Sequence, residues 1–224
     1  SNLDCIMFAL ADSFNNHCEC AAFRARTVSD WYVMLLNEID AALTAENLNV
    51  KLAFCAYTET TWAPETEIIK NPDRFIFEIA PITRSYTVSA TGKRTGTVPF
   101  VRNNITLPKN VDEYMEYVRL WKKAFSGSSY VFEYHFWKHQ VFDISGQKLA
   151  LRVFEDADAY KALGVEGMFA CGSQRSYFPN GYAYYVFARK LYDSELTLEE
   201  ITEDYYSHAY GEVWQKFYNY LENL

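Results

Sequence analysis

The sequence lacks a long apolar run, an excess of basic residues and an even number of cysteines. No stretch approaches the roughly 18 consecutive apolar residues of a membrane-spanning helix, so we expect no membrane span. The net charge of −8 over 224 residues leaves no basic stripe for a phosphate backbone, which argues against nucleic acid as a partner. Five cysteines cannot all pair within one chain, so we expect mostly free thiols.

Signatures of bound cofactors and metals are also missing. No glycine-rich phosphate loop follows any of the predicted strands, which argues against a nucleotide cofactor and against a flavodoxin-like binding domain. The cluster His17-Cys18-Glu19-Cys20 has metal-ligating residue types, but the second ligand pair of a structural zinc site does not follow it. We therefore expect no cofactor and no metal.

What the sequence does contain is five short apolar runs, most of which precede a helical pattern. Strands that alternate with helices predict parallel βα units, which gather functional groups beyond the carboxyl ends of their strands. Five units use about 190 residues, whereas a complete (β/α)8 barrel takes about 250. We therefore expect an α/β, TIM-barrel-like fold that forms the later half of a barrel, with an open five-stranded sheet as the alternative. The runs lie at 6–12, 51–59, 75–82, 130–137 and 167–173.

The segments around these runs carry signals for helix ends and for loops. Ser29 is the expected N-cap of the first long helix, and Gly164 is expected to end a helix at 147–162 in the left-handed conformation. Residues 83–110 show no periodicity and predict a long irregular loop of the kind that often carries function.

The order of these elements predicts two parts. We expect residues 1–193 to form a βα-repeat domain and residues 194–224 to form a C-terminal helical extension packed on it. Thr197 and Glu200 have the spacing of a capping box. Helical spacing predicts the last three helices at 180–192, 198–208 and 210–222.

Carboxylates at the strand ends suit the chemistry of glycoside hydrolysis. That reaction needs one carboxyl group to protonate the leaving oxygen and another to activate water or to attack the sugar. Asp12 and Glu59 end the first and second runs, and Glu133 lies on the fourth. We predict these three residues as catalytic.

The fourth run places several functional side chains on one strand. Residues two apart on a strand share a face, so we expect Glu133, His135 and Trp137 on one face, pointing into a barrel or cleft. Buried ionisable groups need partners or a function, which makes this run the strongest local signal. The alternative is an outward-facing edge strand on which Glu133 and His135 are solvated.

Other strand ends and loops carry residues suited to holding a sugar. Aromatic rings there can stack on sugar rings, and arginines can bind the carboxylate of a uronic acid through two parallel hydrogen bonds. Glu78, deeper in the third strand, is either catalytic or the partner of an arginine such as Arg84 or Arg102. We predict as substrate-binding residues Asn16, Tyr57, Trp62, Glu78, Arg84, His135, Trp137 and Arg175.

Seven segments carry a family resemblance: ALADSFNNHCEC, SDWYVMLLNEID, KLAFCAYTETTWAPE, FIFEIAPITRSY, FEYHFW, LGVEGMF and HAYGEVWQKFYNYL. Together they resemble the domain of unknown function 4838, found in bacterial proteins whose architecture is like that of α-glucuronidases and related barrel glycosidases. The resemblance implies the later strands of such a barrel and a polysaccharide or uronic-acid-bearing glycan as substrate. The family loop often has a third cysteine where Phe23 stands, which argues against a metal or disulfide role here. Pattern positions fall on Asp12, Asn16, Cys18, Glu78 and Glu133.

These observations predict a carbohydrate-active domain that is part of a glycoside hydrolase. Its expected partners are a carbohydrate ligand and the missing N-terminal part of the same polypeptide, with a homodimer of the fragment as a further option. The fragment alone is expected to be inactive. The alternative is a non-catalytic glycan-binding or scaffold module.

Overall fold

The chain folds around a single parallel sheet. The computed structural model describes residues 3–14, 16–172 and 181–224. Its five strands lie in the order β1-β2-β3-β4-β5, and each neighbouring pair is parallel. This confirms the predicted α/β class with five parallel strands, but the sheet is open and has β1 and β5 as its edges. The strands are β1 (Cys5–Phe8), β2 (Lys51–Ala56), β3 (Phe75–Ile79), β4 (Ser128–Glu133) and β5 (Gly167–Ala170).

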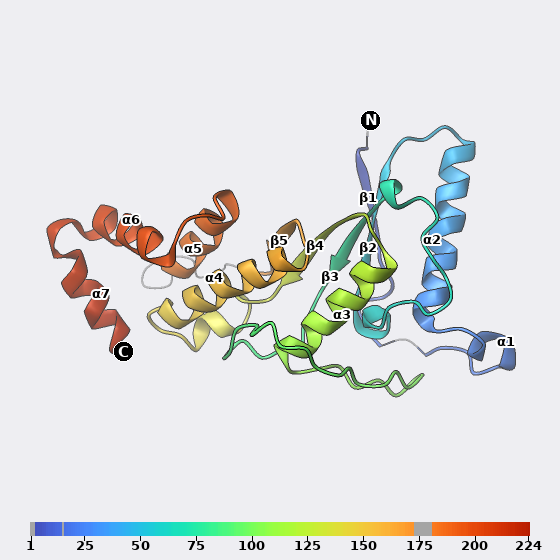
Figure 1. The fold of residues 1–224 in the computed structure, drawn as a ribbon, viewed down its shortest axis with the longest axis horizontal. Helices are drawn as coiled ribbons and strands as arrows, with labels where there is room; N and C mark the ends of the chain where they lie inside the picture. The colour runs from blue at the N-terminus through green and yellow to red at the C-terminus, as the bar shows by residue number, and fades with distance from the viewer. Residues whose placement is uncertain (1–2, 15, 173–180) are drawn as a thin grey trace.

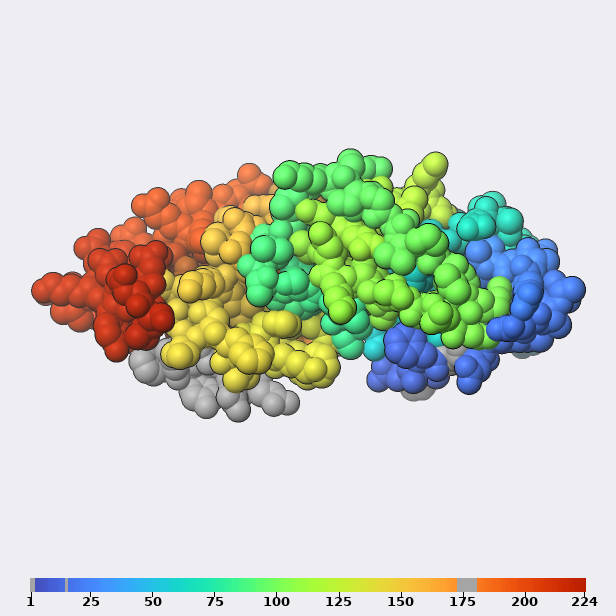
Figure 2. All heavy atoms as spheres, turned by 90° about the horizontal axis from the view of Figure 1, so that it is seen from below, coloured from blue at the N-terminus to red at the C-terminus, as the bar shows by residue number. Residues whose placement is uncertain are grey.

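Helices follow the strands along an elongated molecule. Helices α1 and α2 lie at one end, and α5, α6 and α7 lie at the opposite end (Figures 1 and 2). None of the helices in the described ranges is long and apolar enough to cross a membrane. The helices are α1 (Ala21–Arg24), α2 (Val28–Ala45), α3 (Val111–Ala124), α4 (Gln147–Ala162), α5 (Gly181–Tyr192), α6 (Leu198–Tyr210) and α7 (Trp214–Glu222).

The main core lies between the sheet and helices α2, α3 and α4. Side chains alternate along a strand, so Phe54 and Phe77, which are register partners on β2 and β3, point to the same face. Trp121 of α3 is fully buried against them, with its ring 5.0 Å from that of Phe77. Alternate residues of the strands therefore fix the helices on this face.

A second apolar cluster joins the N-terminal half of α4 to the C-terminal helices. Leu149 and Val153 of α4 pack with Val186 of α5, Ile201 of α6 and Leu221 of α7. The predicted boundary between residues 193 and 194 falls in the turn between α5 and α6. The chain from α5 onward thus depends on α4 for its core.

The opposite face of the sheet, which we call the open face, is not covered by any helix in the described part of the chain. The small apolar core on this face contains Cys55 and Tyr134 but no helical residue. Phe169 of the edge strand β5 stacks on Phe132 at 5.2 Å and remains 58% exposed. Parallel sheets are normally covered on both faces, so this exposure is unusual.

Candidate functional site

Asp12 and Tyr57 meet where β1 and β2 end. The two strands are parallel neighbours, so the residues that follow them lie at the same edge of the sheet. The Tyr57 hydroxyl hydrogen-bonds to Asp12, and burial together with this bond raises the pKa of Tyr57 to about 12. Asp12 itself is exposed. The structure thus holds an accessible carboxylate beside a tyrosine that stays protonated at neutral pH.

Glu59 is fixed in the short 3-10 helix Thr58–Thr61, directly after Tyr57. Thr58 has a φ of 50°, which is a strained conformation for a β-branched residue. Its hydroxyl donates to Glu59 Oε2 at 2.6 Å. Strained residues of this kind cluster at functional sites. The hydrogen bond from Thr58 therefore helps to hold the buried Glu59 carboxylate in its orientation.

His17 lies beside Glu59. Its Nε2 is 3.9 Å from Glu59 Oε1. Burial lowers the pKa of His17, although the Glu59 carboxylate opposes this shift. Asp12, His17, Tyr57 and Glu59 together form what we call the rim group, at the carboxyl ends of β1 and β2.

Glu78 lies lower on the open face, between two neighbouring strands. Cys55 of β2 and Tyr130 of β4 flank it in the strand register, and both side chains hydrogen-bond to it. Burial and the Glu78 carboxylate raise the pKa of both groups. Of the two alternatives for Glu78, the structure does not show the pairing with an arginine, because Arg84 and Arg102 have other partners.

Arg84 and Glu133 belong to a buried ionic network on the helix side of the sheet. Arg84 Nη1 donates to Glu133 Oε1 at 2.7 Å, and Arg84 Nη2 donates to Asp156 Oδ2 at 2.6 Å. All three side chains are fully buried. Glu133 also accepts hydrogen bonds from Tyr86 at 2.6 Å and Tyr160 at 2.5 Å. Each charge in this network therefore has a close partner of opposite charge.

His135 completes this network. Its Nε2 is 2.8 Å from Asp156 Oδ2, and its Nδ1 lies 3.9 Å from Glu133 Oε2 with no hydrogen-bond partner among the described residues. Burial would raise the pKa of Asp156, but Arg84 and the His135 hydrogen bond hold it below its usual value. We call Arg84, Glu133, His135 and Asp156, with Tyr86 and Tyr160, the buried cluster.

The buried cluster includes a possible set of metal ligands. Ligand atoms of Glu133, His135 and Asp156 all lie within 4.8 Å of one another. However, Arg84 already bonds both carboxylates and supplies the positive charge that a metal ion would bring. The geometry fits a salt-bridge network better than a metal centre.

The structure corrects the predicted face of the fourth strand. Strand β4 ends at Glu133, so the alternation does not continue to Trp137. Glu133 and His135 do lie together, but they point towards α4 rather than into the open face. Trp137 instead packs on Tyr134, with ring centroids 5.8 Å apart, and is 45% exposed. Glu133, His135 and Trp137, which were expected on one face, thus lie on two sides of the sheet.

The other predicted binding residues are scattered. The Trp62 indole donates to the Val98 carbonyl at 2.7 Å and packs on Tyr117 of α3, which places it on the helix side. Asn16 is exposed in the loop after β1. Arg175 lies outside the described residues.

Three members of the buried cluster were missed in the sequence: Tyr86, Asp156 and Tyr160. A signal for two of them exists on α4. Asp156 and Tyr160 continue the spacing of the buried Leu149 and Val153, so they fall on the apolar face of the helix. A carboxylate on such a face predicts a buried partner. Tyr86 lies in the irregular loop and gave no comparable signal.

Comparison with known proteins gives one informative result. No curated protein and no solved structure gives a match. The family model described as Domain of unknown function (DUF4838) matches residues 4–221. Because that match spans nearly all of the 224 residues, the chain belongs to the DUF4838 family.

Proposed function

We propose that the chain is the carbohydrate-active part of a glycoside hydrolase and that the rim group is its reactive centre. The observation that carries the proposal is the pair of carboxylates, Asp12 and Glu59, after two adjacent parallel strands. Each is hydrogen-bonded by a neighbouring hydroxyl, from Tyr57 and Thr58 respectively. Glycoside hydrolysis uses two carboxyl groups that flank the scissile bond.

The two carboxylates have contrasting surroundings. Asp12 is exposed, whereas Glu59 is 3% exposed and lies beside His17. Carboxylates in different environments can take different roles, one as proton donor and one as nucleophile or base. The rim group therefore offers two distinct acids within one edge of the sheet.

Trp137 and Lys138 fit the substrate class. The exposed Trp137 ring lies just beyond β4, and Lys138 Nζ is 4.2 Å from the centre of that ring. An aromatic face stacks on a sugar ring, and an exposed ammonium pairs with a uronate carboxylate. Arg84, which the sequence favoured for this role, is held in the buried cluster. We therefore favour Lys138 as the cation for a uronic-acid-bearing glycan.

The test is the release of uronic acid from acidic oligosaccharides by the complete gene product. We expect Asp12→Asn and Glu59→Gln each to lower kcat by about 100-fold or more, the usual contribution of general acid–base catalysis. Trp137→Ala should mainly raise KM. The matched control is Glu38→Gln, which changes an exposed carboxylate on α2 and should leave both constants unchanged.

Unchanged kcat in both rim variants would contradict a catalytic role. If the variants nonetheless lose affinity for the glycan, the non-catalytic binding module is the better description. Thermal melting of each variant separates a local effect from unfolding, since Glu59 is buried.

We also propose that further βα units of the same polypeptide cover the open face and continue the sheet beyond β5. In an open doubly wound sheet the strand order reverses and helices cover both faces. Here the order is consecutive, and α2, α3 and α4 all pack on one face. That arrangement is the one found in (β/α)8 barrels.

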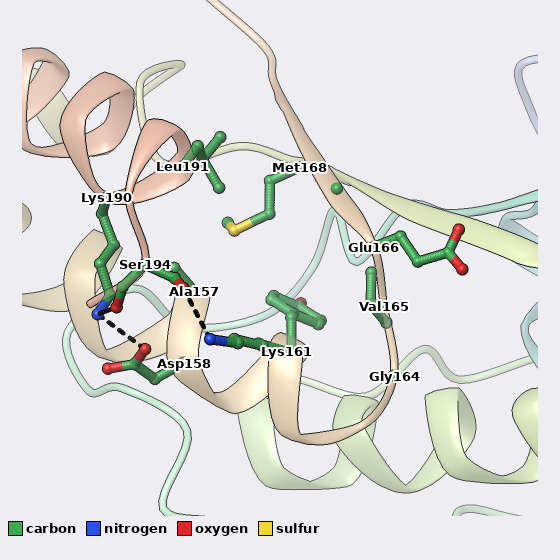
Figure 3. Close-up of a pocket in the computed structure, with 12 residues that line it drawn as sticks. Ala157, Asp158, Lys161, Gly164, Val165, Glu166, Met168, Lys190, Leu191 and Ser194 are labelled. Carbon is green, nitrogen blue, oxygen red and sulfur yellow. Dashed lines mark hydrogen bonds and ion pairs between the residues drawn. The ribbon is translucent and has the colours of Figure 1, made fainter. Parts of the chain in front are cut away.

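Hollows on both sides of β5 support this extension. On the open face, a hollow of about 450 Å³ is bounded by Tyr130, Phe132 and Phe169. On the helix side, a hollow of about 510 Å³ lies between α4, β5 and α5, with Met168 and Leu191 on its walls (Figure 3). An added strand would place alternate side chains in the two hollows and pair with the unpaired backbone of β5.

The second hollow is a poor anion site. Lys190 pairs with Asp158 at 3.0 Å, and Lys161 donates to Ser194 at 2.7 Å (Figure 3). Its two lysines are thus already engaged. Apolar filling by a neighbouring element is therefore the better explanation for the space.

Hydrogen exchange of β5 tests the extension. In this chain alone, the β5 amides that point away from β4 should exchange readily, because an edge strand is open to solvent on one side. They should become strongly protected in the complete gene product. Equal exchange in both proteins would contradict the proposal. Protection that rises with the concentration of this chain alone would instead indicate a homodimer through β5.

A further inference from the structure

Two thiols lie together in the exposed loop between β1 and α1. Cys18 and Cys20 are both exposed, and the Cys20 amide donates to Cys18 Sγ at 3.3 Å. Cys20 is the N-cap of α1 and has extended backbone angles, φ −64° and ψ 157°. Residues two apart on an extended backbone project to the same side. The Cys20 thiol also hydrogen-bonds to Cys18, so the two sulfur atoms are neighbours.

A second loop fixes the backbone around Cys18. Asn103 Oδ1 accepts from the His17 amide at 2.7 Å, and Asn103 Nδ2 donates to the His17 carbonyl at 2.9 Å. The same Nδ2 donates to Glu19 Oε1 at 3.0 Å. The residues on both sides of Cys18 are thus held, which keeps the two thiols in place before any reaction.

Cys20 differs chemically from Cys55 and Cys171. The hydrogen bond with Cys18, together with the backbone amides of Phe23 and Ala22, lowers its pKa. Burial raises the pKa of Cys55 and of Cys171. The thiolate is the reactive form of cysteine. Cys20 is therefore better prepared to react than Cys55 or Cys171.

We propose that Cys18 and Cys20 form a redox-active dithiol that closes into a disulfide, with Glu19 as the single residue between them, on reaction with a low-molecular-weight disulfide. The rest of the fold does not depend on this bond. Exposed disulfides of this type are labile and reversible rather than structural. The reduced form in the structure is then one of two states of the loop.

The reaction has two exchange steps. The Cys20 thiolate attacks one sulfur of the small disulfide, which forms a mixed disulfide and releases one small thiolate. The Cys18 thiolate then attacks the Cys20 sulfur and releases the second small thiolate. Each leaving thiolate takes up one of the protons lost by the two cysteines. The two cysteines are oxidised by two electrons, and the small disulfide is reduced to two thiols.

This proposal does not depend on the glycosidase assignment. The family resemblance argued against a disulfide in this loop, because Phe23 stands where the third cysteine of the family loop would be. A reversible two-cysteine ring needs no third partner.

The experiment uses buffers of glutathione and glutathione disulfide at stepped ratios, followed by alkylation and peptide mass mapping. We expect the peptide with Cys18 and Cys20 to lose two hydrogens and both alkylation sites together as the buffer becomes oxidising. In the reduced protein, Cys20 should alkylate faster than Cys171, because hydrogen bonds lower the pKa of Cys20 whereas burial raises that of Cys171.

Serine variants separate the steps. Cys18→Ser should stop at the glutathione mixed disulfide on Cys20, because the resolving thiol is absent. Cys5→Ser is the matched control and should close the ring as the unchanged chain does. The proposal would be overturned if Cys18 and Cys20 can still be alkylated in the most oxidising buffer. A disulfide from either of them to Cys5 or to a second chain would overturn it as well. All three positions are exposed, and a melting curve for each variant verifies folding.

Discussion

Replacement of Arg84 by methionine is expected to lower the free energy of unfolding by about 3–5 kcal/mol. The guanidinium bonds Glu133 and Asp156 at 2.7 and 2.6 Å, and all three side chains are fully buried. Methionine fills similar space but leaves two buried carboxylates without their cation. Equilibrium urea unfolding measures the loss.

Two further variants test whether the loss comes from the buried charges. Arg94→Met removes an arginine that is 72% exposed and pairs with Glu116 at 2.8 Å, so it should leave the midpoint nearly unchanged. Arg84→Met combined with Glu133→Gln and Asp156→Asn should recover part of the loss, because the uncompensated charges are gone. Equal effects of Arg84→Met and Arg94→Met would show that the buried cluster contributes no special stability.

Acid should act on the same network through Asp156. Its pKa is lowered in the folded state, against about 3.9 when unfolded. The group therefore adds stability above its unfolded pKa, and this contribution is lost as the pH falls through the folded pKa. Because Arg84 supplies part of the shift, the Arg84→Met variant should lose less stability on acidification than the unchanged chain. Equal losses of unfolding free energy between neutral and acidic pH in the two proteins would contradict this expectation.

The second large effect is expected for Asp30→Ala, at about 3 kcal/mol or more. The Asp30 carboxylate accepts three backbone amides, from Glu65, Thr66 and Glu67, at 3.0, 2.8 and 2.9 Å. It also accepts from the amide and hydroxyl of Thr27, which completes the capping box of α2. Alanine leaves these donors without their acceptor.

The control for Asp30 lies on the same helix. Glu38→Ala removes an exposed carboxylate from α2 and should leave stability unchanged or slightly higher, since alanine favours helix. Asp30→Asn keeps one acceptor oxygen and should fall between the two. A loss for Asp30→Ala no larger than that for Glu38→Ala, measured by urea unfolding, would disprove the role assigned to Asp30.

Local signals were read correctly where they are short-range. The helix at 147–162, the left-handed Gly164 with φ 74° and the capping box of Thr197 with Glu200 are all confirmed. The N-cap of α2 is Thr27 rather than the predicted Ser29. Ser29 is buried and donates to the Trp62 carbonyl, a contact 33 residues away that no local pattern contains.

The site was harder to predict because strand alternation gives two faces without saying which one helices will cover. Glu133 and His135 were correctly placed together, but their partners Arg84 and Asp156 come from a loop and from α4. Those partners turn a predicted reactive pair into a buried network. Asp12 and Glu59 remain proposals for catalysis.

The sequence by itself determined the strands, most of the helices and the parallel βα order, because apolar periodicity and caps act within a few residues. Only the tertiary structure decided which carboxylates are buried with arginine and which stand at the open edge. Charge pairing depends on distances of about 3 Å between segments tens of residues apart. Those distances are set by how the helices pack on one face of the sheet.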